Sequence, residues 1–108
     1  FGVWRNRSLD SLGSDTEAGQ TTYDHLYADV RLWLREGWID YVAPQIYFST
    51  QHSKVPYGKL LDWWAHNSYG RHLYVGQGPY KIARDRDSTW FDPRQTGDQL
   101  RLNRHYPE

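Results

Sequence analysis

The amino-acid sequence predicts an α/β fold made of three consecutive β/α units. β-forming segments begin at Phe1, Tyr41 and His72, and a helical segment follows each of them. The helical segments carry apolar residues at intervals of three and four, which is the period of an amphipathic helix. Strict alternation of strand and helix favours parallel strands joined by right-handed crossovers.

The first unit contains a predicted strand over residues 1–5, a loop over 7–22 and a helix over 23–36. Gly, Ser, Asp and Thr cluster in the loop, as they do in irregular segments. Thr22 is a capping residue at the predicted start of the helix, and Gly37 stands where a helix commonly ends.

The second unit has a predicted strand over 41–48 and a helix over 57–66. The third has a strand over 71–76, a polar loop over 83–91 and a helix over 92–104 that opens with Asp-Pro and has a weak apolar face. A (β/α)8 barrel uses about 250 residues for its eight units, so the spacing fits three units of such a barrel. A doubly wound sheet shows the same alternation, and the pattern alone does not decide between the two.

The second predicted strand carries a proline and a glutamine among its β-forming residues. Pro44 removes one ladder hydrogen bond, and we expect a local bulge there. Gln45 would be costly to bury without partners. Alternation with period two places Gln45 and Tyr47 on one face and Val42 and Ile46 on the other.

Superposition of the three predicted strands by their small residues, Gly2, Ala43 and Gly76, extends this alternation to all of them. One face becomes polar and aromatic toward the carboxyl end, with Trp4, Asn6, Gln45, Tyr47, Gly78 and Tyr80. The opposite face is apolar and is expected to pack against helices, with Val3, Val42, Ile46, Leu73 and Val75. Ligands bind at the carboxyl ends of the strands in parallel α/β folds.

Aromatic rings can stack on sugar faces, and amides can bridge sugar hydroxyl groups, so this combination of residues indicates a carbohydrate ligand. The same sequence pattern would also arise if Gln45 and Tyr47 were buried polar residues with satisfied hydrogen bonds and no ligand. The predicted substrate-binding residues are Trp4, Arg5, Asn6, Gln45, Tyr47, Gln77 and Tyr80. The period-two alternation does not place Arg5 and Gln77 on the ligand-facing side, and we include them because strand ends often bulge.

The composition argues against several other classes. The 13 basic and 13 acidic residues balance, which gives no electrostatic basis for binding nucleic acid. No apolar run is long enough to span a membrane. There is no Cys, and the five His residues lack the spacing of metal ligands, so we expect neither a metal nor a cofactor.

Glycoside hydrolysis usually needs two carboxylates that face each other across the scissile bond. None of the 13 acidic residues falls at the inner carboxyl end of a predicted strand. Asp10, Asp15 and Glu17 lie in the first loop, which could fold over a site. The sequence therefore assigns no catalytic residue, and we expect the isolated chain to be inactive.

Four stretches of the chain resemble the bacterial glycosyl hydrolase-like 10 family. They are "FGVWRN", "YDHLYADVRLWLREGWIDYVAPQIYFS", "LLDWWAHNSYGRHLYVGQGPYKI" and "DPRQTGDQLRLNR". The resemblance implies a (β/α)8 barrel, of which residues 1–108 would be an internal fragment. It also implies hydrolysis of O-glycosyl bonds in bacterial cell-wall or related polysaccharide, and export from the cytoplasm. A strand with paired aspartates, implied before "FGVWRN", is not in this sequence.

Two other interpretations stay open at this point. One is a non-catalytic carbohydrate-binding module whose platforms are the six Trp and nine Tyr residues. The other is a structural segment whose sheet edges pair with another copy. Because part of a barrel would leave two edges unpaired, we expect self-association through these edges.

Overall fold

The computed structural model describes residues 2–81 and 94–106. Within them, the structure contains helices and two short strands, as an α/β protein does, but strict alternation of strand and helix is limited to the segment from β1 to α4. The elements are α1 (Thr22–Leu26), α2 (Val30–Arg35), β1 (Tyr41–Val42), α3 (Tyr57–His66), β2 (His72–Leu73), the 3-10 helix η1 (Pro79–Lys81) and α4 (Gln95–Asn103).

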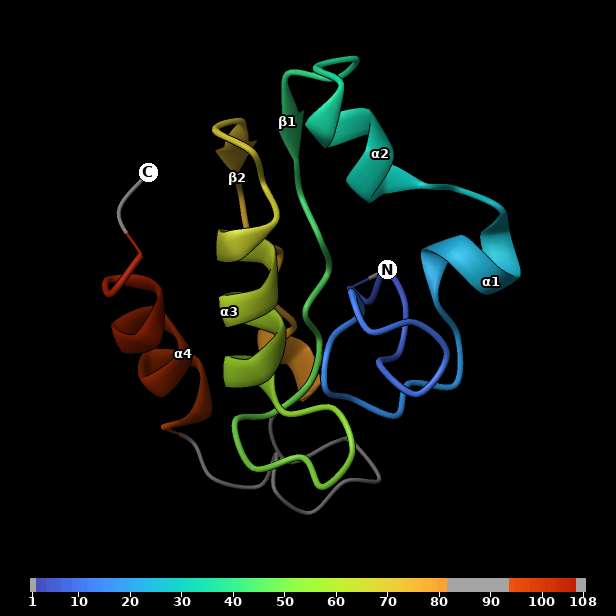
Figure 1. The fold of residues 1–108 in the computed structure, drawn as a ribbon. Helices are drawn as coiled ribbons and strands as arrows, with labels where there is room; N and C mark the ends of the chain where they lie inside the picture. Colours follow the sequence, from blue (N-terminus) through green and yellow to red (C-terminus); the bar gives the residue numbers. More distant parts are fainter. Residues whose placement is uncertain (1, 82–93, 107–108) are drawn as a thin grey trace.

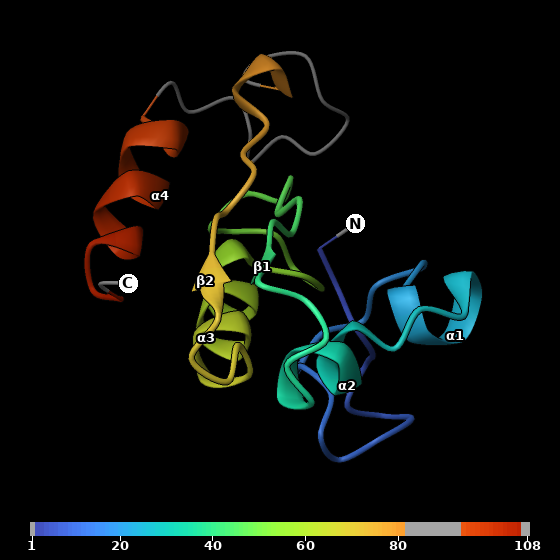
Figure 2. The ribbon, with the colours of Figure 1, turned by 90° about the horizontal axis from the view of Figure 1, so that it is seen from above.

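The elements are arranged around α3. Figures 1 and 2 show α4 on one side of α3 and the pair α1 and α2 on the other, with β1 and β2 side by side between them. The helix α3 connects β1 to β2, so these three elements form one β/α unit followed by the next strand. The order strand, helix, strand agrees with the prediction for this part of the chain, but β1 and β2 are much shorter than the predicted strands over 41–48 and 71–76.

β1 and β2 pair in parallel, as the alternation of elements predicts. Val42 pairs with Leu73, and further along the two segments an isolated bridge joins Gln45 to Gly76. This register places Gly76 beside Gln45 and not beside Ala43, so the superposition by small residues is wrong for these strands. A glycine is placed where a neighbouring backbone comes close, and that position along the strand differs between strands.

Pro44 interrupts the ladder without inserting a residue. The pairs on either side of it have the same separation along the chain, so these described segments contain no bulge and that prediction is wrong. On either side of the proline the bonds continue, from Tyr74 N to Val42 O at 2.9 Å and from Ile46 N to Gly76 O at 3.0 Å. The loss is confined to the one bond that proline cannot donate.

No strand forms over the described residues 2–5, contrary to the prediction. The carbonyl of Val3 accepts a hydrogen bond from the amide of Thr22 at 2.9 Å, and the carbonyl of Arg5 accepts from Ser14 at 2.9 Å. These backbone groups therefore bond to the chain that follows them and not to β1. The segment has a β-forming composition, but its backbone pairs with residues 14 and 22 of the following loop and not with a strand.

The long helix predicted over 23–36 is two short helices, α1 and α2. The chain breaks at Tyr27, whose φ of 56° lies in the left-handed region. Asp29 then caps α2 by accepting from Leu32 N at 3.2 Å, and the same carboxylate oxygen accepts from the indole of Trp4 at 3.0 Å. A capping residue within the apolar pattern is the sequence signal for this break.

The helix α3 has the bounds predicted for it, and its apolar face forms the centre of the core. α4 confirms the third helix over residues 95–103. The predicted start of that helix at residues 92–93, and the predicted loop over 83–91, lie outside the described residues.

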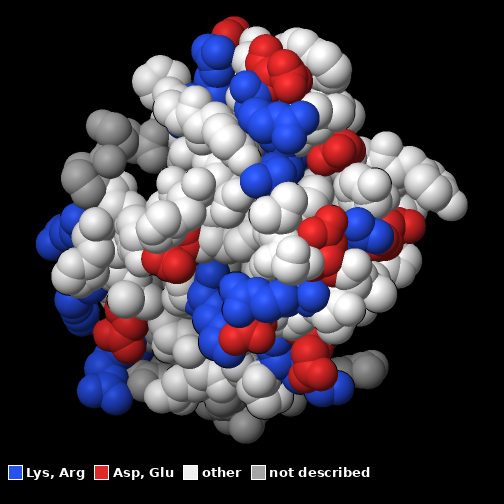
Figure 3. All heavy atoms as spheres, viewed as in Figure 1, with Lys and Arg blue, Asp and Glu red and all other residues white. Residues whose placement is uncertain are grey.

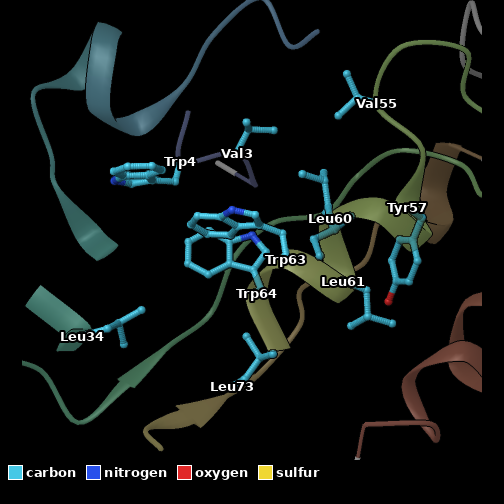
Figure 4. Packing of buried hydrophobic residues seen from close by; sticks show 11 residues of the cluster. Val3, Trp4, Leu34, Val55, Tyr57, Leu60, Leu61, Trp63, Trp64 and Leu73 are labelled. Carbon is cyan, nitrogen blue, oxygen red and sulfur yellow. The ribbon is translucent and has the colours of Figure 1, made fainter. Parts of the chain in front are cut away.

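Three indole rings pack together at the centre of the core, as Figure 4 shows. The rings of Trp4 and Trp63 stack, with centroids 5.6 Å apart and an angle of 16° between the planes. Trp64 meets Trp63 edge-on at 4.9 Å. Because indole carries one N–H that needs an acceptor when buried, these rings also determine where polar backbone groups lie.

The two indoles of α3 bond to two separate stretches of chain. Trp64 donates to the carbonyl of Gly2 at 2.8 Å, and Trp63 donates to the carbonyl of Leu12 at 2.9 Å. The N-terminal segment and the first loop are thus both attached to α3 by adjacent tryptophans.

A buried tyrosine links α3 to α4 and to the segment after β2. Tyr57 is fully buried, its O–H donates to Asn103 Oδ1 at 2.7 Å, and Gln77 Nε2 donates to its oxygen at 3.2 Å. Burial raises the pKa of Tyr57, although the hydrogen bonds with Gln77 and Asn103 act in the opposite direction.

This raised pKa predicts a loss of stability at high pH that depends on Tyr57. Below the ordinary tyrosine pKa of 10.0 both the folded and unfolded chains hold the proton, and the stabilisation is complete. Above it the unfolded chain releases the proton first, so the free energy of unfolding falls as pH rises toward the folded pKa. Tyr57→Phe should reduce this slope in urea denaturation between about pH 8 and pH 11.

Tyr106→Phe is measured in the same experiment to separate the contribution of Tyr106 from that of Tyr57. The hydrogen bond to Asp62 raises the pKa of Tyr106, so this residue contributes its own slope in the same direction. A Tyr57→Phe chain whose alkaline slope equals that of the wild type would contradict the prediction.

The strand pair exposes aromatic side chains on the face away from α3. Tyr41 and Tyr74 are 58% and 56% exposed, and their rings meet edge-on at 5.8 Å. Among the described residues each strand has one neighbour, so each also has an open edge. Exposed edges and aromatic patches of this kind favour association.

We therefore predict that the 108-residue chain self-associates. Light scattering should give a mass above that of the monomer, increasing with concentration. A monodisperse monomer with a cooperative thermal transition would show that the open edges are tolerated.

Candidate functional site

A cavity of about 590 Å³ lies where the first loop meets the segment that follows β1. It contains the amide, phenol, imidazole, carboxylate and ammonium groups discussed below. The lining residues are Gly2, Val3, Glu17, Ala18, Gly19, Gln20, Gln45, Tyr47, Phe48, His52, Lys54 and Val55. This is the carboxyl-end side of β1, where parallel α/β folds bind ligands.

Gln45 lines the cavity from a closely fixed backbone position. Its side chain is exposed, while the following Ile46 is completely buried, as the period-two alternation predicts. A Cβ atom at Gly2 would overlap the carbonyl of Gln45, and one at Gly76 would lie 3.6 Å from its Cα. Gly2 must therefore be glycine, because only hydrogen fits between the two backbones.

Tyr47 is half-buried, with its ring packed over Gly78. A Cβ atom at Gly78 would lie 3.1 Å from the ring, so the glycine leaves the space that the ring occupies. The ammonium of Lys81 donates to the carbonyl of Tyr47 at 2.8 Å and lies 5.8 Å from the ring centre of Phe48. Lys81 of η1 therefore contacts both aromatic residues of the cavity wall, Tyr47 and Phe48.

His52 has a ring tautomer that its surroundings determine. Its Nδ1 accepts from the backbone amides of Lys54 at 3.2 Å and Val55 at 3.0 Å. In the neutral ring the proton must then be on Nε2, which makes that atom a hydrogen-bond donor. The ring also meets Phe48 edge-on at 5.3 Å.

His52 is not among the residues predicted from the sequence, because the five histidines lack metal-ligand spacing and no other pattern singles it out. Gln20, Phe48 and Lys54, which line the cavity from irregular segments, were not predicted either. The only available signal was the loop's position directly after a strand end, where functional residues are common.

The carboxylates of the first loop separate in the structure. Glu17 lines the cavity and is the one carboxylate among its described lining residues. Asp15 bonds to Lys59 at 3.2 Å, and Asp10 bonds to Arg5 at 3.1 Å. The first loop thus reaches a cavity, as was considered from the sequence, but it does not bring a pair of carboxylates there.

Two of the seven predicted substrate-binding residues, Gln45 and Tyr47, lie together at this cavity. Trp4 lies in the core, 4% exposed, and Gln77 points toward Tyr57 between the helices. The expected mouth shared by all three strands is therefore not formed by the described residues. The side chain of Tyr80 lies outside what the structure describes.

Arg5 and Asn6 organise the first loop. Arg5 forms ion pairs with Asp24 and Asp10, both at 3.1 Å. Burial by itself would lower the pKa of the Arg5 guanidinium, but the hydrogen bond and charge of Asp24 raise it overall. Asn6 donates to the carbonyl of Ala18 at 2.9 Å and accepts from its amide at 3.0 Å. Substrate contact by Arg5 and Asn6 stays a prediction.

Charged side chains of both signs are interspersed on the face seen in Figure 3. This face therefore offers no single-signed region for a polyanion. Among the described residues, no group of His, Cys, Asp and Glu has the arrangement of a metal site. In the same part of the chain, no helix is long and apolar enough to cross a bilayer.

Comparison of the sequence with known proteins shows the family to which the chain belongs. A family model described as glycosyl hydrolase-like 10 matches residues 1–92, and the chain belongs to this family. The resemblance stated from the sequence is confirmed.

Two relatives are named glycosyl hydrolases. Glycosyl hydrolase YngK of Bacillus subtilis (strain 168) is 50% identical over 106 residues, which are 96% of this chain and 21% of YngK. Glycosyl hydrolase DigH of Escherichia coli (strain K12) is 48% identical over 84 residues, which are 76% of this chain and 19% of DigH. The chain thus spans about a fifth of the length of these relatives.

The alternation along the second strand predicts opposite effects for adjacent substitutions. Gln45→Ala should change the free energy of unfolding by less than about 1 kcal/mol, because the side chain is exposed. Ile46→Ala should lower it by about 2–5 kcal/mol, because a completely buried side chain leaves a cavity. Urea denaturation of both variants tests this contrast, and a larger loss for Gln45→Ala would disprove it.

Proposed function

We propose that this chain is a substrate-contacting part of a glycoside hydrolase that acts on bacterial cell-wall or related polysaccharide. One observation carries the proposal: Gln45 and Tyr47 lie with His52 around a cavity at the carboxyl-end side of the parallel strands. The names of the relatives support the reaction class, since both are called glycosyl hydrolases.

The cavity groups suit the chemistry of a sugar. The amide of Gln45 both donates and accepts hydrogen bonds, as neighbouring sugar hydroxyl groups require. Tyr47 and Phe48 offer ring surface for the C–H face of a pyranose.

We propose that the catalytic carboxylates come largely from other parts of the longer protein. Hydrolysis requires one carboxyl group to protonate the leaving oxygen and a second to act as base or nucleophile. Glu17 is the carboxylate that the described part of this cavity supplies. The paired aspartates implied by the family resemblance would provide the acid and its partner.

We further propose that the chain contributes three β/α units to a (β/α)8 barrel and that the protein is exported. The parallel pairing of β1 and β2 across the crossover helix α3 supports the barrel. Closure by further strands would cover the exposed Tyr41 and Tyr74. Export follows from the family resemblance and from a substrate in the cell wall.

The binding-module interpretation receives less support from the structure. Trp4, Trp63 and Trp64, which could have served as stacking platforms, are all buried in the core. A module of this kind would bind glycan and leave it intact, so turnover distinguishes the two functions.

The test uses the full-length protein and soluble glycan strands prepared from bacterial cell wall. We expect release of reducing ends, and we expect Gln45→Ala and Tyr47→Ala each to reduce kcat/KM about tenfold, as loss of a substrate contact does. Gln51→Ala is the matched control, because this exposed amide in the following loop does not line the cavity.

In the same assay the isolated chain should release nothing, because its described cavity has a single carboxylate. Wild-type turnover in both cavity variants, with binding also unchanged, would contradict the proposed function.

A further inference from the structure

Two buried glutamines attach the helix α4 to the segment that lines the cavity. The buried residues of α4 are Gln95 and Gln99, which are 2% and 0% exposed, while Leu100 is 50% exposed. The two glutamines are four residues apart and so lie on one helix face. A helix held only for stability would bury leucine at these positions.

Both glutamines bond to the backbone of the segment that lines the cavity. Gln95 Oε1 accepts from the amide of Thr50 at 2.7 Å, and Gln99 Nε2 donates to the carbonyl of Phe48 at 3.1 Å. Gln99 Nε2 also donates to Gln95 Oε1 at 3.1 Å, which joins the two side chains. Phe48 is a lining residue, and Tyr47 and His52 flank these two bonded positions.

Two more bonds fix the same short stretch from other elements. Lys81, at the end of η1, donates to the carbonyl of Tyr47 at 2.8 Å. The carbonyl of Ser49 accepts from the amide of Tyr57 at the start of α3, at 2.9 Å. Backbone groups from residue 47 to residue 50 are therefore bonded to three different helices.

Stability alone does not account for the glutamines. The Oε1 atom of Gln99 is buried and has no hydrogen-bond partner among the described residues, which costs free energy. Well-packed apolar residues avoid such a cost. A glutamine can, however, fix a backbone carbonyl or amide at a defined place, which leucine cannot do.

We propose that Gln95 and Gln99 are positioning residues for the glycan cavity. They hold the backbone at Phe48 and Thr50 so that Tyr47 and His52 keep one arrangement toward the substrate. Preorganised supporting bonds of this kind preserve the geometry of a binding site. The inference rests on the proposed function, because it assumes that this cavity receives glycan.

The first test is hydrogen exchange in the full-length protein, which does not depend on activity. Gln95→Leu removes the acceptor of the Thr50 amide and should raise the exchange rate of that amide about tenfold. Gln95→Glu keeps an acceptor at the same distance and should restore protection. Leu102→Ala is the control: Leu102 lies one turn beyond Gln99 and packs against the core, so this change loosens the apolar packing of α4 and leaves both glutamine side chains in place.

The second test is steady-state kinetics on soluble cell-wall glycan strands. Gln95→Leu should raise KM about tenfold with kcat within about twofold of wild type, because substrate contacts are displaced. Gln95→Glu should recover most of the wild-type KM. Leu102→Ala should lower the melting temperature and leave KM unchanged. If Gln95→Leu does not fold, Gln95→Asn replaces it, because the shorter amide lengthens the bond to Thr50.

The outcomes separate this inference from the proposed function. Wild-type KM in Gln95→Leu, together with a raised KM in Gln45→Ala, would overturn the positioning role and leave the cavity as the glycan site. Unchanged KM in both variants would overturn the proposed function, and the positioning role with it. A raised KM in Leu102→Ala equal to that of Gln95→Leu would show that the glutamines act only through stability.

Discussion

The indole N–H groups of α3 determine where much of the irregular chain lies. Trp63 and Trp64 donate to the carbonyls of Leu12 and Gly2, neither of which belongs to a helix or strand. A segment without a ladder has few ways to satisfy its polar groups in a core. The same two rings therefore provide both the apolar packing and the acceptor positions that fix the N-terminal segment and the first loop relative to the sheet.

The wall of the cavity formed by Tyr47 and Phe48 is also an irregular segment whose backbone carbonyls accept hydrogen bonds from side chains. There the side chains of Gln99 and Lys81 donate to backbone carbonyls at Phe48 and Tyr47. Both walls are thus irregular segments held by side-chain donors from neighbouring helices. This arrangement allows the chain to present polar side chains at a strand end, where the regular ladder has already stopped.

The sequence predicts the parts of the fold in which local pattern and tertiary contact agree. The period of α3, the parallel pairing and the opposite orientations of Gln45 and Ile46 all follow from residue spacing. The first segment could not be predicted, because its composition favours a strand while its partners lie in the following loop. The break before α2 was visible as Asp29, but the apolar period continues across it and suggested one helix.

The candidate site was predictable only in the extended segment that continues β1, where Gln45 forms an isolated bridge to Gly76. Gln45 and Tyr47 were found because alternation with period two fixes their side. His52 and Glu17 come from loops, whose course depends on bonds such as that between Glu17 N and the carbonyl of Lys54 at 3.0 Å. Composition contains no information about such pairings. Trp4 was misplaced for the same reason, since its neighbour in space is Trp63, far away in the sequence.

The glycine beside Gln45 separates what can change in this site from what cannot. Any side chain at Gly2 would collide with the backbone of residue 45, whereas the side chain of residue 45 itself is exposed and lines the cavity. Substitutions at position 45 can therefore change glycan specificity with little effect on folding, whereas position 2 must remain glycine. Divergent family members could acquire new glycan preferences through such a position without first acquiring extra stability.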